Sequence, residues 1–185
     1  MRRILLAGIL AGVVVFVWSA IDHMVLPVGH MGVKVLPHED VLLPVLRAGI
    51  TEGGLYVFPG MDTTKKPTPE EYKAWEARFV AGPTGILVIH PGGQQPMTSR
   101  QLSSELLTDI LAGLIAAFVV SHTTAPFGRR VLIVMLLGLF GWLSISTSYR
   151  IWYGFPTAYV LGEGIDQVVG WLFGGVAIGW MYRRS

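Results

Sequence analysis

Residues 161–185 read LGEGIDQVVGWLFGGVAIGWMYRRS, and this stretch indicates the class of fold. Almost every residue after Gln167 is apolar, and about 20 such residues form a helix long enough to cross the hydrocarbon core of a membrane. Glu163, Asp166 and Gln167 nevertheless open the run at helical spacings of three and four, so they share one face. A carboxylate that faces lipid near the bilayer centre costs about 2.5–3.5 kcal/mol. This face is therefore expected to turn toward other helices.

The composition of the whole chain also indicates a membrane protein. Of its 185 residues, 52% are hydrophobic and only 14% are charged, and the mean hydropathy is +0.55. A soluble domain has about 25% charged residues. The formal net charge of +2 and the lack of a basic cluster argue against a nucleic-acid partner. The absence of cysteine excludes disulfides and thiolate metal sites.

Four stretches are apolar and long enough to be predicted as membrane-spanning helices. They lie at residues 4–24, 104–123, 131–151 and 159–182. The N-terminal stretch imitates a signal peptide, but cleavage after Ala20 would place Trp18 where a small residue is required. Residues 1–24 are therefore expected to hold a retained first transmembrane helix.

Arginine pairs predict the orientation of these helices. They flank the spans on one side only, whereas the short loop at 152–159 has no basic residue. The pairs are Arg2 and Arg3, Arg129 and Arg130, and Arg183 and Arg184. Because short cytoplasmic loops carry the excess of Lys and Arg, both termini are expected in the cytoplasm. The predicted fold is thus an α-helical integral membrane protein with four transmembrane helices. An extracytoplasmic α/β insertion at 25–103 separates helix 1 from helices 2–4 of residues 104–185.

Small residues recur at spacings of three and four within the predicted spans. They are Gly8 and Gly12, Gly170 and Gly174, Gly175 and Gly179, and, in the second span, Ala112, Gly113, Ala116 and Ala117. Such patterns allow two helix backbones to approach closely in lipid. Glycine is also simply common in membrane helices, but recurrence in three spans favours a closely packed bundle.

The insertion is expected to form a small mixed α/β lobe. Strands are predicted at 32–36, 54–58 and 85–90, and a short helix interrupted by a proline is predicted at 38–49. A second helix is expected to begin at Thr68, since Pro69 and Glu71 complete a capping box with proline at the first helical position. The spacing of its aromatic residues predicts that they are buried against the strands. These residues are Tyr72, Trp75 and Phe79.

Polar side chains gather at the predicted extracytoplasmic ends of all four spans. They are Asp22, His23, Glu105, Asp109, Arg150, Glu163, Asp166 and Gln167. Arg150 is expected to pair with one of the acids, and the remaining acids must be protonated, hydrated or balanced by a cation. Three interpretations follow: a structural network that fixes helix register and docks the lobe, a site for a proton, metal or cationic ligand, and catalysis by paired carboxylates. No HExxH or GxSxG motif supports the third.

Histidines suggest a narrower metal hypothesis. His23, His30 and His38 lie within a short stretch that also contains Asp22, Glu39 and Asp40. Imidazole with carboxylate suits zinc or Cu(II). The irregular spacing matches no standard site, and surface histidines are common. A metal ion is thus the one cofactor to which the sequence points, and no other cofactor is predicted.

Two segments carry a resemblance to known proteins. The stretches IDHMVLP at 21–27 and WYGFPTAYVLGEGIDQVVGW at 152–171 resemble small bacterial four-helix inner-membrane proteins to which no activity is attached. The resemblance implies a location in the bacterial inner (cytoplasmic) membrane and assigns no role to any residue.

The function predicted from the sequence is non-enzymatic. The small size, the glycine-lined helix faces and the projecting lobe favour an accessory or structural subunit of a larger bacterial membrane complex. Its expected partners are the lipid bilayer and either other membrane subunits or further copies of the chain. The alternative is a small transporter, or a cation- or metal-binding membrane protein, that uses the acidic cluster. A membrane enzyme is the third interpretation.

Overall fold

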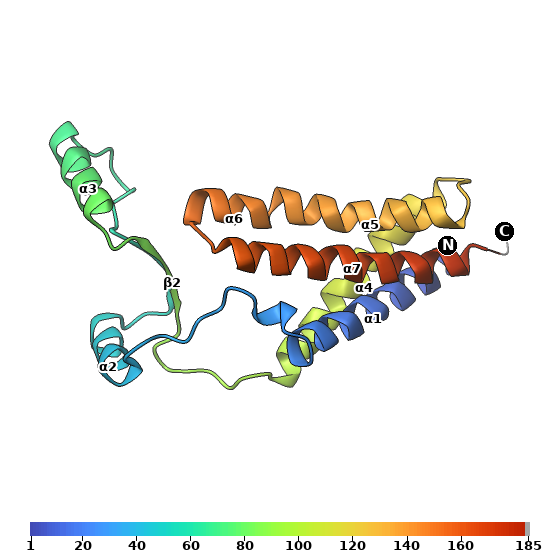
Figure 1. Cartoon of the computed structure of the whole chain (residues 1–185), viewed down its shortest axis with the longest axis horizontal. Coiled ribbons are helices and arrows are strands. Elements are labelled where there is room, and N and C mark those ends of the chain that lie inside the picture. Colours follow the sequence, from blue (N-terminus) through green and yellow to red (C-terminus); the bar gives the residue numbers. More distant parts are fainter. Residues whose placement is uncertain (184–185) are drawn as a thin grey trace. The chain divides into compact units, whose positions relative to one another are not determined.

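The computed structural model describes residues 1–183 and contains two compact units (Figure 1). The first unit is helical and joins residues 1–33 to the chain from residue 97 onward, and the second comprises residues 34–96. The second unit is shorter than the predicted lobe of 25–103, since residues 25–33 and 97–103 belong to the helical unit.

The helical unit is built on long helices that pack side by side (Figure 1). Its elements are α1 (Arg2–Met24), η1 (Val28–His30), α4 (Ser99–Ser121), α5 (Phe127–Ser144), α6 (Ser146–Tyr153) and α7 (Thr157–Met181). Helix α1 packs against α4 and α7, and α7 also packs along α5. Helix α6 follows α5 after a break at Ile145.

Three of these helical segments, among the described residues, are long and apolar enough to cross a membrane. They are α1, α4 and the continuous stretch formed by α5 and α6. Helix α7 has 25 residues and is not among them. Three of the four predicted spans are therefore confirmed as long apolar helices, and the fourth span remains a prediction.

The second predicted span begins earlier in the structure than its hydropathy indicated. Helix α4 starts at Ser99, after Thr98, which forms a capping box with Gln101. The Thr98 hydroxyl accepts a hydrogen bond from the Gln101 amide at 3.2 Å, and the Gln101 carboxamide oxygen accepts one from the Thr98 amide at 2.7 Å. Asp109 consequently lies near the middle of a 23-residue helix rather than near its start.

Close approach of helix backbones depends on glycine at the contact between α1 and α4. A Cβ added to Gly8 would lie 2.6 Å from the Cα of Leu114, and a Cβ on Gly113 would strike the carbonyl oxygen of Gly8. On the opposite side, a Cβ on Gly175 of α7 would lie 2.9 Å from the carbonyl oxygen of Val131 in α5. Because such contacts permit no side chain, the expectation that small residues mark the helix contacts is confirmed.

Basic and aromatic residues converge at one end of the helical unit. The guanidinium groups of Arg3 and Arg130 lie 5.7 Å and 5.4 Å from the centre of the Tyr182 ring. Arg130, which is buried, also donates a hydrogen bond to the carbonyl oxygen of Tyr182 at 2.7 Å. Arg183 lies over the ring of Phe127. Arginines from three separate parts of the sequence thus share one end, where the N-terminus also lies (Figure 1).

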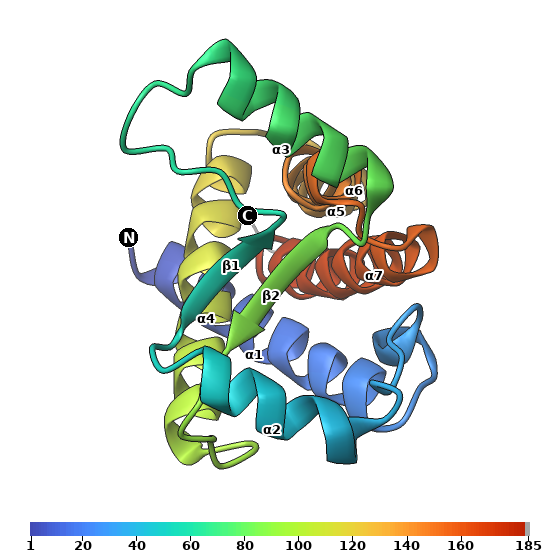
Figure 2. The same ribbon diagram turned by 90° about the vertical axis from the view of Figure 1, so that its left-hand side faces the viewer.

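The second unit contains α2 (Glu39–Gly49), β1 (Gly54–Phe58), α3 (Pro69–Ala81) and β2 (Gly85–Ile89). The strands β1 and β2 form an antiparallel two-stranded sheet in which Leu55 faces Val88 (Figure 2). The predicted helix at 38–49 and the predicted strands at 54–58 and 85–90 are confirmed within one residue. The predicted strand at 32–36 is wrong. That segment alternates like a strand, but β1 and β2 pair only with each other and leave it no neighbour.

Helix α3 begins as its sequence predicts. The Thr68 hydroxyl accepts a hydrogen bond from the Glu71 amide at 3.2 Å, and the Glu71 carboxylate accepts one from the Thr68 amide at 2.9 Å. The expected burial of its aromatic face is wrong for two of three residues, since Tyr72 and Phe79 are 49% and 44% exposed. Trp75 is half-buried and donates a hydrogen bond to the carbonyl oxygen of Pro59 at 2.9 Å. Residues 34–96 contain no fully buried side chain, so this unit has too few layers to form a core.

Candidate functional site

The last turn of α1 carries the most completely buried acid of the described chain. Asp22 is 0% exposed, and neither of its carboxylate oxygens has a hydrogen-bond partner. The chain covers it by turning back through η1, where Gly29 packs against the backbone of His23. A Cβ on Gly29 would lie 2.7 Å from the Cα of His23. A Cβ on Gly162 of α7 would lie 2.9 Å from the carbonyl oxygen of Val28. Two glycines thus let η1 close over the end of α1.

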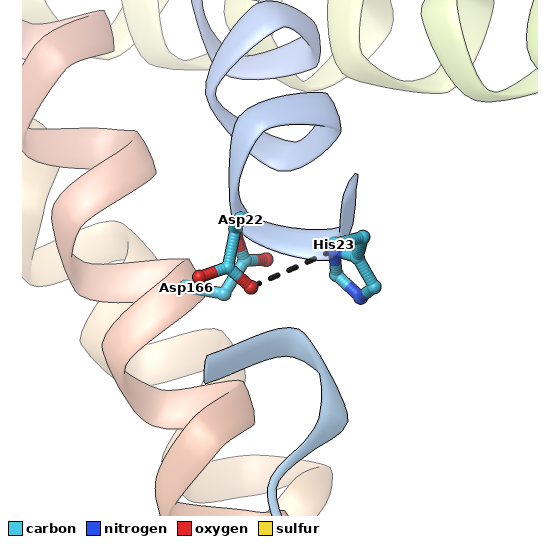
Figure 3. Close-up of side chains that lie close together, drawn as sticks. All are labelled: Asp22, His23 and Asp166. Carbon is cyan, nitrogen blue, oxygen red and sulfur yellow. Dashed lines mark ion pairs between the residues drawn. The ribbon is translucent and has the colours of Figure 1, made fainter. Parts of the chain in front are cut away.

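His23 lies beside this acid with its ring partly open to solvent. Its Nδ1 atom is 3.6 Å from Oδ2 of Asp22 and 3.0 Å from the carbonyl oxygen of Ser19. A carbonyl oxygen can only accept, so in the neutral ring an Nδ1–H donates to Ser19. Figure 3 shows the ring with Nδ1 turned toward the carboxylate of Asp22.

Helix α7 brings a second carboxylate to the same place. One donor atom from each of Asp22, His23 and Asp166 lies within 4.8 Å of the other two. Figure 3 shows the carboxyl groups of Asp22 and Asp166 close together, beside the ring of His23. The indole of Trp18 donates a hydrogen bond to the backbone carbonyl of Asp166 at 3.2 Å, which holds α7 against α1 at this level. Oδ1 of Asp166 is buried without a hydrogen-bond partner.

Two cavities adjoin Asp166. The first has a volume of about 360 Å³, and its polar lining residues are Ser19, Glu105, Thr108, Asp109, Asp166 and Gln167. The rest of its lining is largely apolar and includes Leu137 and Trp171. The second has a volume of about 400 Å³ and is bordered by His23, Glu105, Glu163, Asp166 and Gln167. Both cavities are lined by acids and by no lysine or arginine.

Arg150 does not neutralise these acids, and the predicted ion pair is wrong. Within residues 1–183 its guanidinium forms no salt bridge. Its Nε donates a hydrogen bond to the hydroxyl of Thr157 at 3.0 Å, at the start of α7. The physical reason is that Arg150 lies near the end of α6, beside the start of α7, whereas Asp166 lies more than two helical turns further along α7 than Thr157.

The structure accounts for the other predicted site residues as follows. Glu105, Asp109, Glu163 and Gln167 line one or both cavities. In the predicted histidine group, His30 lies on η1 and His38 lies in the other unit, before α2. The one group of converging His and acid donor atoms among the described residues shares His23 and its neighbour Asp22 with that prediction, and its third member is Asp166.

Sequence reasoning missed the specific pairing of Asp22 with Asp166, as well as the parts played by Trp18 and the Ser19 carbonyl. A signal was available for the acids, since each lies in an apolar span and requires a polar neighbour. The sequence contains no comparable signal for the hydrogen bond of Trp18.

Comparison of the chain with protein-family models, with curated proteins and with solved structures finds no match.

Proposed function

We propose that the protein is a multi-pass membrane protein that binds a cation between α1 and α7. The observation that carries this proposal is the burial of Asp22. Its carboxyl group is fully buried and accepts no hydrogen bond, and the carboxyl group of Asp166 lies beside it. Burial of an ionised carboxylate without a partner is strongly unfavourable. Two carboxylates about 5 Å apart also repel each other by about 3 kcal/mol at an effective dielectric constant of about 20. A bound cation, including a proton, removes both penalties.

Residues 1–183 supply too little positive charge near these acids to balance them. Arg150 is engaged by Thr157, and the cavity linings contain no lysine or arginine. His23, when protonated, contributes one positive charge beside two carboxyl groups. Glu105, Asp109 and Glu163 add further acidic groups along the same cavities. The surplus of acid favours a cation from solution.

We infer that the protein crosses the membrane four times and that α7 is the fourth transmembrane helix. Helix α7 is 25 residues long and packs between α1 and α5, so its acids lie among helices. The convergence of Arg3, Arg130 and Arg183 at one end supports a cytoplasmic location for both termini. With this topology, the lobe and the cation site lie on the extracytoplasmic side of a bacterial inner membrane.

Reporter fusions test this topology. Fusions after Arg130 and at Ser185 are expected to report a cytoplasmic location, and a fusion at Lys65 an extracytoplasmic one. A signal from the extracytoplasmic side at Ser185 would contradict the count of four spans.

Cation-dependent stability tests the binding function. The melting temperature of the purified protein in detergent is measured at lower pH, to test protons, and with Na⁺, Mg²⁺, Ca²⁺ or Zn²⁺ at matched ionic strength. At least one of these cations is expected to raise the melting temperature of the wild type. The increase should be lost in Asp22→Asn and Asp166→Asn and retained in Asp40→Asn, an exposed acid of α2. Equal responses in all four proteins would show that the carboxyl groups bind no cation.

A second function, that of an accessory subunit, is favoured by the surface of the lobe. Leu55 and Val88 are 64% and 62% exposed, and they share a face of the sheet with Val57 and Ile86. A two-stranded sheet with an uncovered apolar face is marginally stable alone, and exposed apolar patches mark interaction sites.

Purification of the full chain in a mild detergent, followed by mass spectrometry, tests the subunit function. A stoichiometric partner protein that is lost with Leu55→Glu, and retained with Lys66→Glu, would support it. Recovery of the chain without any partner protein would contradict it.

A further inference from the structure

We propose that the bound cation is a divalent transition metal of the zinc class, held by Asp22, His23 and Asp166. This inference rests on the proposed cation-binding function and names the ligand of the same site. Its second support, beyond the acids themselves, is that Asp22 is fully buried, that neither of its carboxylate oxygens has a hydrogen-bond partner, and that one of them lies close to the donor atoms of His23 and Asp166. Buried polar groups are rarely without a partner in proteins, and a bound cation would provide one for Asp22.

The donor chemistry selects the class of metal. Mg²⁺ and Ca²⁺ prefer oxygen ligands alone, whereas imidazole suits zinc and its neighbours in the transition series. The site combines one imidazole with two carboxylates. Zinc sites whose fourth position is open hold the metal with three protein ligands, and His, Asp and Glu are all zinc ligands.

The distances in the site approach those of a bound metal. Ligands about 2.0–2.2 Å from a tetrahedral zinc ion lie about 3.4 Å from one another. Nδ1 of His23 and Oδ2 of Asp22 are already 3.6 Å apart. All three donor atoms lie within 4.8 Å of one another, so shifts on the order of 1 Å would bring them to the separation found around zinc.

His23 can serve as a ligand through Nδ1. In the neutral ring the proton then resides on Nε2, and Nδ1 presents its lone pair to the metal. The hydrogen bond from Nδ1 to the Ser19 carbonyl is lost in that tautomer. The Ser19 carbonyl stays within the helix and retains its backbone partner there.

Three protein ligands leave one coordination position free. His23 and Asp166 both border the cavity of about 400 Å³, so this position faces a space that water or an exchangeable ligand can enter. Structural zinc sites are closed by four protein ligands, and open sites hold a metal that reacts or exchanges. The site is thus suited to a metal that is bound and released, or that carries a reactive water.

Metal titration of the full-length protein in detergent tests the inference. The protein is stripped with a chelator and then titrated with Zn²⁺, with Co²⁺ as the spectroscopic probe and with Mg²⁺ for comparison. The expected result is one Zn²⁺ per chain, a visible Co²⁺ absorption and a rise in melting temperature, with no response to Mg²⁺. His23→Gln, Asp22→Asn and Asp166→Asn should each weaken Zn²⁺ binding at least tenfold. His30→Gln, a nearby histidine outside the site, should bind as the wild type does.

The outcomes separate this inference from the proposed function. If Zn²⁺ does not bind but Na⁺ or protons stabilise the protein through Asp22 and Asp166, the metal assignment is wrong and the cation site stands. If no cation stabilises the protein, both are wrong. Zn²⁺ binding that survives His23→Gln, or that is lost in His30→Gln, also overturns the assignment. Because His23 is exposed, His23→Gln is expected to fold, and its Co²⁺ spectrum decides the question even if the aspartate variants do not fold.

Discussion

Substitution of Gly113 by alanine should loosen the contact between α1 and α4. An added Cβ would strike the carbonyl oxygen of Gly8 and would lie 2.9 Å from the amide nitrogen of Gly12, whereas ordinary contacts are 3.4 Å or longer. The obstructing atoms all belong to backbone, so no side chain can rotate away and the helices must separate. Overpacking of this kind lowers the unfolding free energy by about 1–3 kcal/mol. We expect a loss of about 2–3 kcal/mol here, because backbone atoms cannot move aside as a side chain can. The better helix propensity of alanine offsets about 1 kcal/mol, which leaves a net loss of about 1–2 kcal/mol.

Gly128→Ala provides the matched control, because a Cβ at this position of α5 meets no atom within 4 Å. Both substitutions gain the better helix propensity of alanine, but only Gly113→Ala meets an obstructing backbone. The unfolding free energies of the two variants should therefore differ by about 2–3 kcal/mol. Equilibrium unfolding in mixed micelles, followed by tryptophan fluorescence, measures both. Equal stabilities for the two alanine variants would refute the view that glycine permits the backbone contact.

Three further substitutions test individual interactions. Asp22→Asn should raise the unfolding free energy in chelator by about 1 kcal/mol or more, because it removes a buried charge, and stability below wild type there would contradict the account of this residue. Thr68→Ala should destabilise the start of α3 by about 1 kcal/mol, and hydrogen exchange should speed up at the Glu71 amide, which loses its acceptor. Trp142→Phe should lower the unfolding free energy by about 1 kcal/mol, because the Trp142 indole donates to the Val160 carbonyl at 2.7 Å. An unchanged unfolding curve for Trp142→Phe would show that this bond contributes nothing.

Local signals in the sequence were sufficient for several elements. The capping box at Thr68 involves only residues three apart, so its hydrogen bonds do not depend on the rest of the fold. The same signature occurs at Thr98 and Gln101, where it places the start of α4 five residues before the start inferred from hydropathy. Hydropathy locates the segment that suits lipid, whereas capping residues locate the end of the helix.

Pairings between distant residues could not be predicted in the same way. Alternation at 32–36 resembles a strand, but a strand also requires a neighbour, and none pairs with this segment. Charge alone made Arg150 a natural partner for several acids, yet the turn between α6 and α7 places it beside Thr157, at the start of α7. The approach of Asp22 to Asp166 depends on how α1 crosses α7, which spacing within either helix does not determine.

Asp22 is buried by the packing of η1 against α1 and α7, and this packing depends on the small size of glycine rather than on charge. Gly29 and Gly162 allow η1 to settle between α1 and α7, and that closure excludes water from the carboxyl group. Neither glycine contributes a donor to replace the lost water, so the acid is left with the imidazole of His23 and the carboxyl group of Asp166 as its polar neighbours. Larger residues at the two glycines would keep η1 away and leave Asp22 hydrated, with no need for a cation. By letting η1 pack over Asp22, the two glycines remove the water that would stabilise its charge. The proposed cation provides that stabilisation instead.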